Sequence, residues 1–157
     1  RNYITYVLMG DSEFAEGSIY EALQLASYYN LNNLCLILDV NRLGQSGPTM
    51  LGHDLNSYEK RIRSFDWNIA TINGHNLTEI KNSLNIVKKS KKPMVIIAKT
   101  LKGKGVSFLE NNEGWHGRAL SKEQLDMALK EIEEPEMPKF RINKPSKIKK
   151  FLKDKVG

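Results

Sequence analysis

The sequence predicts an α/β fold, in which a mainly parallel sheet carries helices on both faces. Short apolar runs at residues 3–9, 34–40 and 94–98 contain almost no charge, as expected of strands that are covered on both faces. Segments with helical spacing alternate with these runs, which is typical of a parallel sheet. The loops at residues 41–53 and 99–120 each follow a strand. We therefore expect both loops on the rim where the strands end.

The first half of the chain supplies two strands and two helices. Residues 3–9 predict a buried strand, and Gly10 lets the backbone turn tightly after it. A helix over about residues 15–30 follows, with Asn30 as its C-cap. One face of this helix carries four apolar residues, Ile19, Ala22, Leu23 and Ala26. Residues 34–40 form the second strand. A second helix is indicated by the spacing of Leu55, Tyr58, Ile62 and Phe65.

The second half repeats the alternation. Residues 67–72 alternate as a strand and lead into a turn at residues 73–74, and residues 94–98 form a fourth buried strand. Capping-box patterns at residues 76–79 and 121–124 predict the starts of two more helices. The first of these has a buried stripe of Leu77, Ile80, Leu84 and Val87. The second runs through Leu125, Leu129 and Ile132.

Bulk composition restricts the class of protein. The 157 residues suffice for one domain, and 40% hydrophobic with 27% charged residues is typical of a soluble globular protein. No apolar run is long enough to span a membrane. Because Cys35 is the single cysteine, no disulfide framework can form, and a reducing compartment, the cytoplasm, is expected. The chain begins at Arg1 rather than Met, which indicates a piece of a longer or processed polypeptide.

The net charge of +6 is concentrated in the tail. Residues 135–157 contain eight Lys or Arg and two acidic residues, whereas residues 1–134 hold equal numbers of basic and acidic side chains. We therefore predict an α/β domain over residues 1–134 and a basic, proline-containing linker or arm over residues 135–157. The aromatic residues of the arm are Phe140 and Phe151, too few for a base-stacking surface. A nucleic-acid partner is therefore not expected.

Asp11 and Asn41 are candidate metal ligands. Each follows an apolar run, and they stand thirty residues apart, about the length of one βαβ unit. In a parallel sheet this spacing places both just past the carboxyl ends of two strands, where such sheets bind ligands. A carboxylate and an amide oxygen suit Mg²⁺, which needs few protein ligands when phosphates complete its shell. The alternative is that Asp11 only turns the chain and Asn41 only ends a strand.

Five segments together resemble a known family. They are GDSEFAEGS at residues 10–18, DVNRLGQ at residues 39–45, NGH at residues 73–75, AKTLKGKG at residues 98–105 and EGWHG at residues 113–117. In order and spacing they resemble the diphosphate-binding part of transketolase, over roughly residues 3–132. The resemblance implies a partial domain of the thiamine-diphosphate-binding fold, with thiamine diphosphate and Mg²⁺ as cofactors.

The resemblance also implies a metal and diphosphate site. Mg²⁺ would be held by the side chains of Asp11 and Asn41 and by the backbone carbonyl of Leu43. The backbone N–H of Ser12, where the family usually has glycine, would bind the diphosphate, and Gln45 would lie against the cofactor. The alternatives are that Leu43 packs into the core and that Gln45 is an ordinary polar loop residue.

Three more side chains have roles implied by the resemblance. Lys102 would lie near the diphosphate or the substrate, where its charge neutralises phosphate, unless it is a solvated loop lysine. His116 would contact cofactor or substrate as a hydrogen-bonding or proton-transfer group, unless it only follows a tryptophan that anchors a turn. Glu16 would join the glutamate network at the subunit interface that tunes cofactor activation, although a carboxylate near a helix start is also stabilised by the helix dipole. His53 and His75 have no such support and are expected to be turn or surface residues.

The activity implied is transfer of a two-carbon ketol unit between sugar phosphates, as in the pentose phosphate pathway. The cofactor carries the chemistry as an electron sink, and the protein binds and orients it. A preceding histidine-bearing segment and a pyrimidine-binding domain would complete the site across a dimer interface, either fused to this chain or as separate subunits. The alternatives are a deoxyxylulose-phosphate synthase, the thiamine enzyme of a 2-oxo acid dehydrogenase, and a degenerate non-catalytic subunit, which the departure at Ser12 would fit.

Overall fold

A computed structural model describes residues 3–132 of the chain. Its strands form one sheet in the order β1-β2-β4-β3, and every neighbouring pair is parallel. The strands are β1 (Thr5–Gly10), β2 (Leu34–Val40), β3 (Asn68–Asn73) and β4 (Met94–Lys99). The helices are α1 (Gly17–Tyr28), α2 (Leu55–Arg63), α3 (Leu77–Val87) and α4 (Lys122–Glu131), with a 3₁₀ turn, η1, at Glu13–Ala15. The predicted α/β class and parallel sheet are confirmed.

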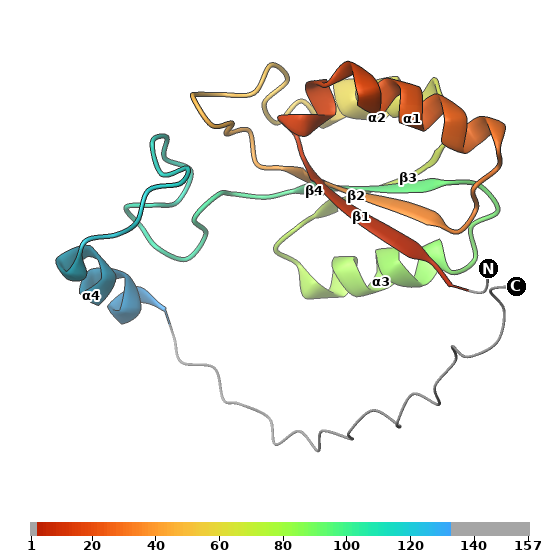
Figure 1. Ribbon diagram of the computed structural model, residues 1–157. Coiled ribbons are helices and arrows are strands. Elements are labelled where there is room, and N and C mark those ends of the chain that lie inside the picture. Colours follow the sequence, from red (N-terminus) through yellow and green to blue (C-terminus); the bar gives the residue numbers. More distant parts are fainter. Residues whose placement is uncertain (1–2, 133–157) are drawn as a thin grey trace, which may run out of the picture.

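The strand order explains why helices cover both faces. The connections from β1 to β2 and from β2 to β3 proceed in one direction across the sheet, whereas the connection from β3 to β4 turns back. Because crossovers between parallel strands are right-handed, the reversed connection places its helix on the opposite face. Figure 1 shows this arrangement, with α1 and α2 on one face and α3 on the other.

Two apolar clusters form the core, one on each face of the sheet. The larger packs Leu23 of α1 and Tyr58 and Ile62 of α2 against β2 and β4. The smaller joins Val87 of α3 to one face of the same two strands. The central strand β4 is buried from Met94 to Ala98, as predicted for residues 94–98.

Strand β1 is exposed, so the prediction of a buried strand over residues 3–9 is wrong. Leu8 is 75% exposed, and Tyr6 and Val7 are also exposed. Within residues 3–132, β1 stands at the edge of the sheet and pairs with β2 alone. Apolar side chains are therefore buried in β2 and β4, which have neighbouring strands on both sides, whereas those of β1 are exposed.

Several element boundaries differ from those predicted. Helix α1 begins at Gly17 rather than residue 15, because η1 occupies the residues before it. It ends at Tyr28 with Tyr29 as the C-cap, and Asn30 follows in the left-handed conformation with φ 49°. Strand β3 is shifted by one residue from the predicted range, and Phe65 lies past the end of α2.

Helix α3 buries fewer of its apolar residues than predicted. Leu77 is 81% exposed, and the buried residues of α3 are Ser83 and Val87. At the start of α3 the side chain of Asn76 caps the helix as expected, but the Glu79 carboxylate accepts from the Asn73 N–H instead of closing the capping box.

Helix α4 lies beyond the carboxyl ends of the strands, apart from the sheet (Figure 1). Its capping box between Ser121 and Gln124 is present as predicted. Only Ala128 of α4 is buried, whereas Leu125, Leu129 and Ile132 are exposed. The Glu131 carboxylate holds the helix to the preceding loop by accepting from the N–H and the hydroxyl of Ser107, at 2.6 and 2.8 Å.

The part of the chain that the structure describes contains no helix long and apolar enough to cross a membrane. The predicted linker or arm over residues 135–157 lies outside the described residues.

Candidate functional site

The candidate site lies where β1 and β2 end. These strands are paired in parallel with Gly10 opposite Asp39, so Asp11 and Asn41 emerge on neighbouring strands at the same rim. The location predicted from their spacing is therefore confirmed. The two long loops, which follow β2 and β4, leave the sheet on the same rim (Figure 1).

A cavity of about 360 Å³ opens at this rim. Its lining contains every site residue predicted from the sequence: Asp11, Ser12, Glu16, Asn41, Leu43, Gln45, Lys102 and His116. The remaining lining residues are Gly10, Glu13 and Gly44. Residues up to 106 positions apart in the sequence thus meet in one polar cavity.

Asp11 is the buried anion of this cavity, with 4% of its surface exposed. Its Oδ2 accepts from the backbone N–H of Arg42 at 2.7 Å and from the Thr49 hydroxyl at 3.0 Å. Burial raises the pKa of the Asp11 carboxyl, although these two hydrogen bonds partly oppose the rise. A buried carboxylate that pays this desolvation penalty is stabilised by a nearby cation.

Asn41 is oriented by two hydrogen bonds. Its Nδ2 donates to Asp39 Oδ2 at 2.9 Å, and its Oδ1 accepts from the backbone N–H of Leu43 at 3.0 Å. Asp39 also accepts from the Thr100 hydroxyl at the end of β4. The side chain of Leu43 is buried, so Leu43 packs into the core and lines the cavity at the same time. The backbone carbonyl of Leu43 is therefore the group that is available to a ligand.

These oxygen donors fit a hard cation. Among residues 3–132 there is no group of three or more His, Cys, Asp or Glu side chains that is able to hold a metal. Within the lining, Asp11 supplies a buried carboxylate, Asn41 an amide oxygen and Leu43 a backbone carbonyl. Hard oxygen donors in small number suit Mg²⁺ that shares its shell with phosphate, and they do not suit a closed zinc site.

Ser12 fits its position without strain. Its backbone has φ −67° and ψ −47°, an ordinary right-handed conformation that does not require glycine. The space for its hydroxyl comes from Gly44, where an added Cβ would stand 3.0 Å from Ser12 Oγ and 3.2 Å from the Gly47 carbonyl oxygen. The departure from the family pattern at Ser12 is thus accommodated by a glycine in the facing loop.

Lys102 and His116 form a pair in the lining of the cavity. The Nζ atom of Lys102 lies 3.1 Å from Nδ1 of His116, although fourteen residues separate them. Glu16 is the N-cap residue of α1, is exposed, and makes no side-chain hydrogen bond with the helix end. Its carboxylate therefore lines the cavity without being engaged by its own helix.

Three residues that support the cavity were not predicted from the sequence. Thr49 hydrogen-bonds Asp11, as described above. Arg42 and Asn111 both have left-handed backbones, with φ 67° and 57°, and their side chains join the two long loops. No local sequence signal identifies such a contact, because the partners are 69 residues apart.

His53 and His75 lie outside the cavity lining. His53 Nε2 is 3.0 Å from the Thr100 carbonyl oxygen, and His75 Nε2 accepts from the Leu101 N–H at 2.8 Å. Both histidines therefore hold the start of the loop after β4, which is a structural role; His53 is half-buried and His75 is exposed.

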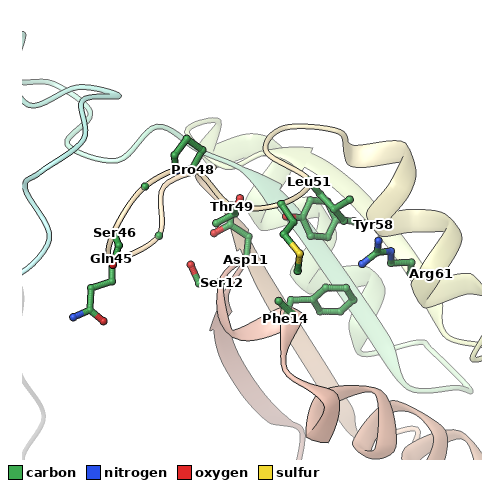
Figure 2. Close-up of a pocket in the computed structure, with 14 residues that line it drawn as sticks. Asp11, Ser12, Phe14, Gln45, Ser46, Pro48, Thr49, Leu51, Tyr58 and Arg61 are labelled. Carbon is green, nitrogen blue, oxygen red and sulfur yellow. The ribbon is translucent and has the colours of Figure 1, made fainter.

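A second cavity of about 500 Å³ adjoins the first and shares Asp11, Ser12, Gly44 and Gln45 with it. Figure 2 shows Phe14, Tyr58 and Arg61 on one side of Asp11 and Thr49, with Gln45 and Ser46 on the opposite side. The rings of Phe14 and Tyr58 pack with centroids 5.6 Å apart and form its apolar wall.

Comparison with known proteins assigns the family. The family model described as the thiamine diphosphate binding domain of transketolase matches residues 1–156. The chain belongs to the transketolase family. Human transketolase is 43% identical over 131 residues, which are 83% of this chain and 21% of that protein. The chain thus spans about a fifth of the length of the transketolases that it matches.

Solved transketolase structures agree with this family assignment. The high-resolution crystal structure of transketolase from Campylobacter jejuni matches with a TM-score of 0.73 and 35% identity, over 82% of this chain and 20% of that one. Transketolase from Pichia stipitis in complex with sedoheptulose 7-phosphate matches with a TM-score of 0.60 and 29% identity, over 68% of this chain and 16% of that one. The fold and the transketolase resemblance predicted from the sequence are confirmed, as a partial domain of this transferase.

Proposed function

We propose that this chain forms the diphosphate- and magnesium-binding wall of a transketolase, which transfers a two-carbon ketol unit between sugar phosphates. One observation carries the proposal: all eight residues expected from the transketolase motifs line a single cavity at the carboxyl ends of the strands. Parallel sheets bind ligands at such rims, and the family match names thiamine diphosphate as the ligand.

In this proposal Asp11, Asn41 and the Leu43 carbonyl hold Mg²⁺, and the ion grips the diphosphate. The Ser12 N–H and Gln45 contact the cofactor. The raised pKa of Asp11, caused by its burial, supports the metal assignment because a cation would relieve the cost of a buried charge. The paired hydrogen bonds of Asn41 support it too, since they fix the direction of the amide oxygen.

Bound thiamine diphosphate supplies the electron sink that ketol transfer requires. The chain's own residues bind and orient the cofactor and the substrate. Lys102 neutralises negative charge at the phosphates or the substrate, and His116 hydrogen-bonds or moves a proton at a substrate oxygen. Glu16 contributes a carboxylate at the mouth of the cavity, where it joins the network that activates the cofactor.

The substrates and partners follow from the family. A related transketolase from Pichia stipitis binds sedoheptulose 7-phosphate in its crystal structure, which supports sugar phosphates as substrates here. This chain spans about a fifth of the length of human transketolase. The family resemblance implies that a histidine-bearing segment and a pyrimidine-binding domain complete the catalyst. We propose that they join it in a homodimer or a split-subunit assembly that acts in the pentose phosphate pathway.

We also propose a cytoplasmic setting. The thiol of Cys35 is buried and unpaired with another cysteine, and burial raises its pKa to about 11. It is therefore a protonated, structural side chain in β2, compatible with a reducing compartment.

The metal assignment is tested by Asp11→Ala in the complete enzyme. Calorimetric titration with thiamine diphosphate and Mg²⁺ is expected to show binding weakened by more than about 100-fold, since even changes outside the ligand shell cost up to that factor. Asp66→Ala is the matched control, because Asp66 is exposed and pairs with Lys92 away from the cavity. Equal affinity of Asp11→Ala and the parent enzyme would refute the ligand assignment.

A further inference from the structure

Arg42 joins the two loops that surround the cavity. Its Nε donates to Asn111 Oδ1 at 2.6 Å, and its Nη2 donates to the Asn111 backbone oxygen at 2.9 Å. Its backbone N–H donates to Asp11 Oδ2 at 2.7 Å. One residue therefore contacts the buried carboxylate at the end of β1 and, through its side chain, the loop that follows β4.

The backbones at both ends of this contact adopt a conformation that side-chain-bearing residues rarely take. Arg42 has φ 67° and Asn111 has φ 57°. Asparagine visits the left-handed region more readily than most residues, but arginine has no local preference for it. Non-glycine residues persist there only where the surrounding contacts hold them. The three hydrogen bonds donated by Arg42 are such contacts.

The link continues from Asn111 to the histidine. The Asn111 N–H donates to the Lys102 backbone oxygen at 2.8 Å, which fixes the main chain of Lys102. Lys102 Nζ then lies 3.1 Å from His116 Nδ1. An ammonium group donates hydrogen bonds and accepts none, so Nδ1 must be the acceptor. In the neutral imidazole the proton therefore resides on Nε2.

We propose that Arg42 is a positioning residue that holds the Lys102–His116 pair against the metal-binding loop and thereby keeps His116 in its Nε2–H tautomer. His116 then presents an N–H donor rather than a lone pair to whatever oxygen enters the cavity. The benefit for ketol transfer rests on the function proposed above. The tautomer itself is a property of the chain without ligand.

The three histidines of the chain allow an internally controlled test. His53 faces a carbonyl oxygen through Nε2 and must carry its proton there, whereas His75 accepts at Nε2 and must carry its proton on Nδ1. Nitrogen-15 NMR of the histidine-labelled, 157-residue chain at pH 8 reports each tautomer. His116 is expected to resemble His53 and to differ from His75.

Arg42→Met removes the guanidinium and keeps an unbranched side chain. The ratio of Nε2–H to Nδ1–H at His116 is expected to fall about fivefold, which corresponds to about 1 kcal/mol for one part-exposed hydrogen bond. Lys102→Met, which removes the donor itself, should give the same shift. Arg63→Met is the matched control, because Arg63 is exposed on α2 and its ion pair is with Glu59 of the same helix. His53 and His75 should keep their tautomers in all three variants.

An unchanged tautomer at His116 in Arg42→Met overturns the proposal. If all three histidines change, the loop has lost its fold, and Asn111→Gly decides instead: glycine tolerates φ 57°, and the variant removes the carboxamide with its Oδ1 acceptor while keeping the backbone oxygen. A change confined to His116 in that variant supports the proposal, and no change overturns it. Calorimetry with thiamine diphosphate and Mg²⁺ on the complete enzyme is the separate test, because failure to bind would count against the proposed function and leave the tautomer result intact.

Discussion

At the residue scale, Asp11 illustrates how a binding site costs stability. Its carboxylate is buried at the end of β1, and burial raises its pKa above the ordinary value of 3.8. A carboxyl whose pKa is higher in the folded chain holds its proton more tightly there than in the unfolded chain. Its stabilising contribution is therefore present at low pH and is lost as pH rises from about 3.8 through the raised pKa.

We accordingly expect Asp11→Asn to raise the melting temperature of the chain at neutral pH in the absence of Mg²⁺. Asparagine keeps an oxygen that is able to accept from Arg42 and Thr49 but carries no charge to bury. The difference in melting temperature between Asp11→Asn and the parent chain should grow as pH rises above 3.8 and then stay constant. In more acidic solution this difference should vanish. Thermal unfolding over a pH series measures it. A variant that is less stable than the parent at pH 7 would contradict the idea.

His116 allows binding and turnover to be separated. It lies on the exposed side of the cavity and its Nδ1 is engaged by Lys102, so it is placed to serve a substrate rather than to anchor the diphosphate. In the complete enzyme, His116→Ala should lower kcat by about 100-fold or more, typical for loss of a proton-transfer group, and weaken cofactor binding by less than about tenfold. Steady-state kinetics and calorimetry compare the two. A larger effect on binding than on turnover would make His116 an anchor.

A site residue could be predicted from the sequence when the pattern that marks it lies close to it along the chain. Asp11 and Asn41 were located correctly because a strand end and a fixed spacing are visible in the sequence. Arg42 was missed because its role depends on a left-handed backbone and on Asn111, 69 residues away. Thr49 was missed for the same reason, since the loop must fold back before its hydroxyl meets Asp11.

At the scale of elements, the sequence predicted which strands and helices form better than it predicted how deeply each one is buried. Strands β1 and β2 have nearly the same apolar composition, yet Leu8 is 75% exposed and Leu38 is fully buried. Composition does not reveal which strand stands at an edge, because edge position is decided by pairing. Likewise Leu77 falls at helical spacing but is 81% exposed in the described part of the chain, so periodicity alone marked it wrongly as core.

This contrast between β1 and β2 predicts opposite outcomes for two leucine changes. Leu38→Ala should lower the free energy of unfolding by about 2–5 kcal/mol, because it leaves a cavity in the core. Leu8→Thr should change it by less than about 0.5 kcal/mol, since little surface is buried and threonine suits a strand. Urea unfolding measures both. Light scattering should also show less self-association for Leu8→Thr, because an exposed apolar edge strand is a template for pairing. A cost for Leu8→Thr close to that of Leu38→Ala would show that β1 is covered in solution.

At the scale of the whole molecule, topology accounts for the site. Parallel strands all end at one rim, so the short turn after β1 and the long loops after β2 and β4 meet there without any further constraint. Each loop brings one part: Asp11 and Ser12 from the first, Asn41 to Gln45 from the second, Lys102 and His116 from the third. The cavity is polar and open, which suits one wall of a larger site better than a complete active site.

The open wall predicts that this chain alone has no ketol transferase activity. Catalysis in a preorganised site requires that water be excluded and that the cofactor be held on both sides, and a chain spanning about a fifth of its relatives offers one side. The 157-residue chain, with thiamine diphosphate, Mg²⁺, xylulose 5-phosphate and ribose 5-phosphate, should therefore give no seven-carbon product above background. Addition of the histidine-bearing segment and the pyrimidine-binding domain, fused or separate, should restore turnover, and Asp11→Ala in the same mixture should remove it again. Activity of the chain by itself, insensitive to Asp11→Ala, would mean that another set of residues performs the chemistry.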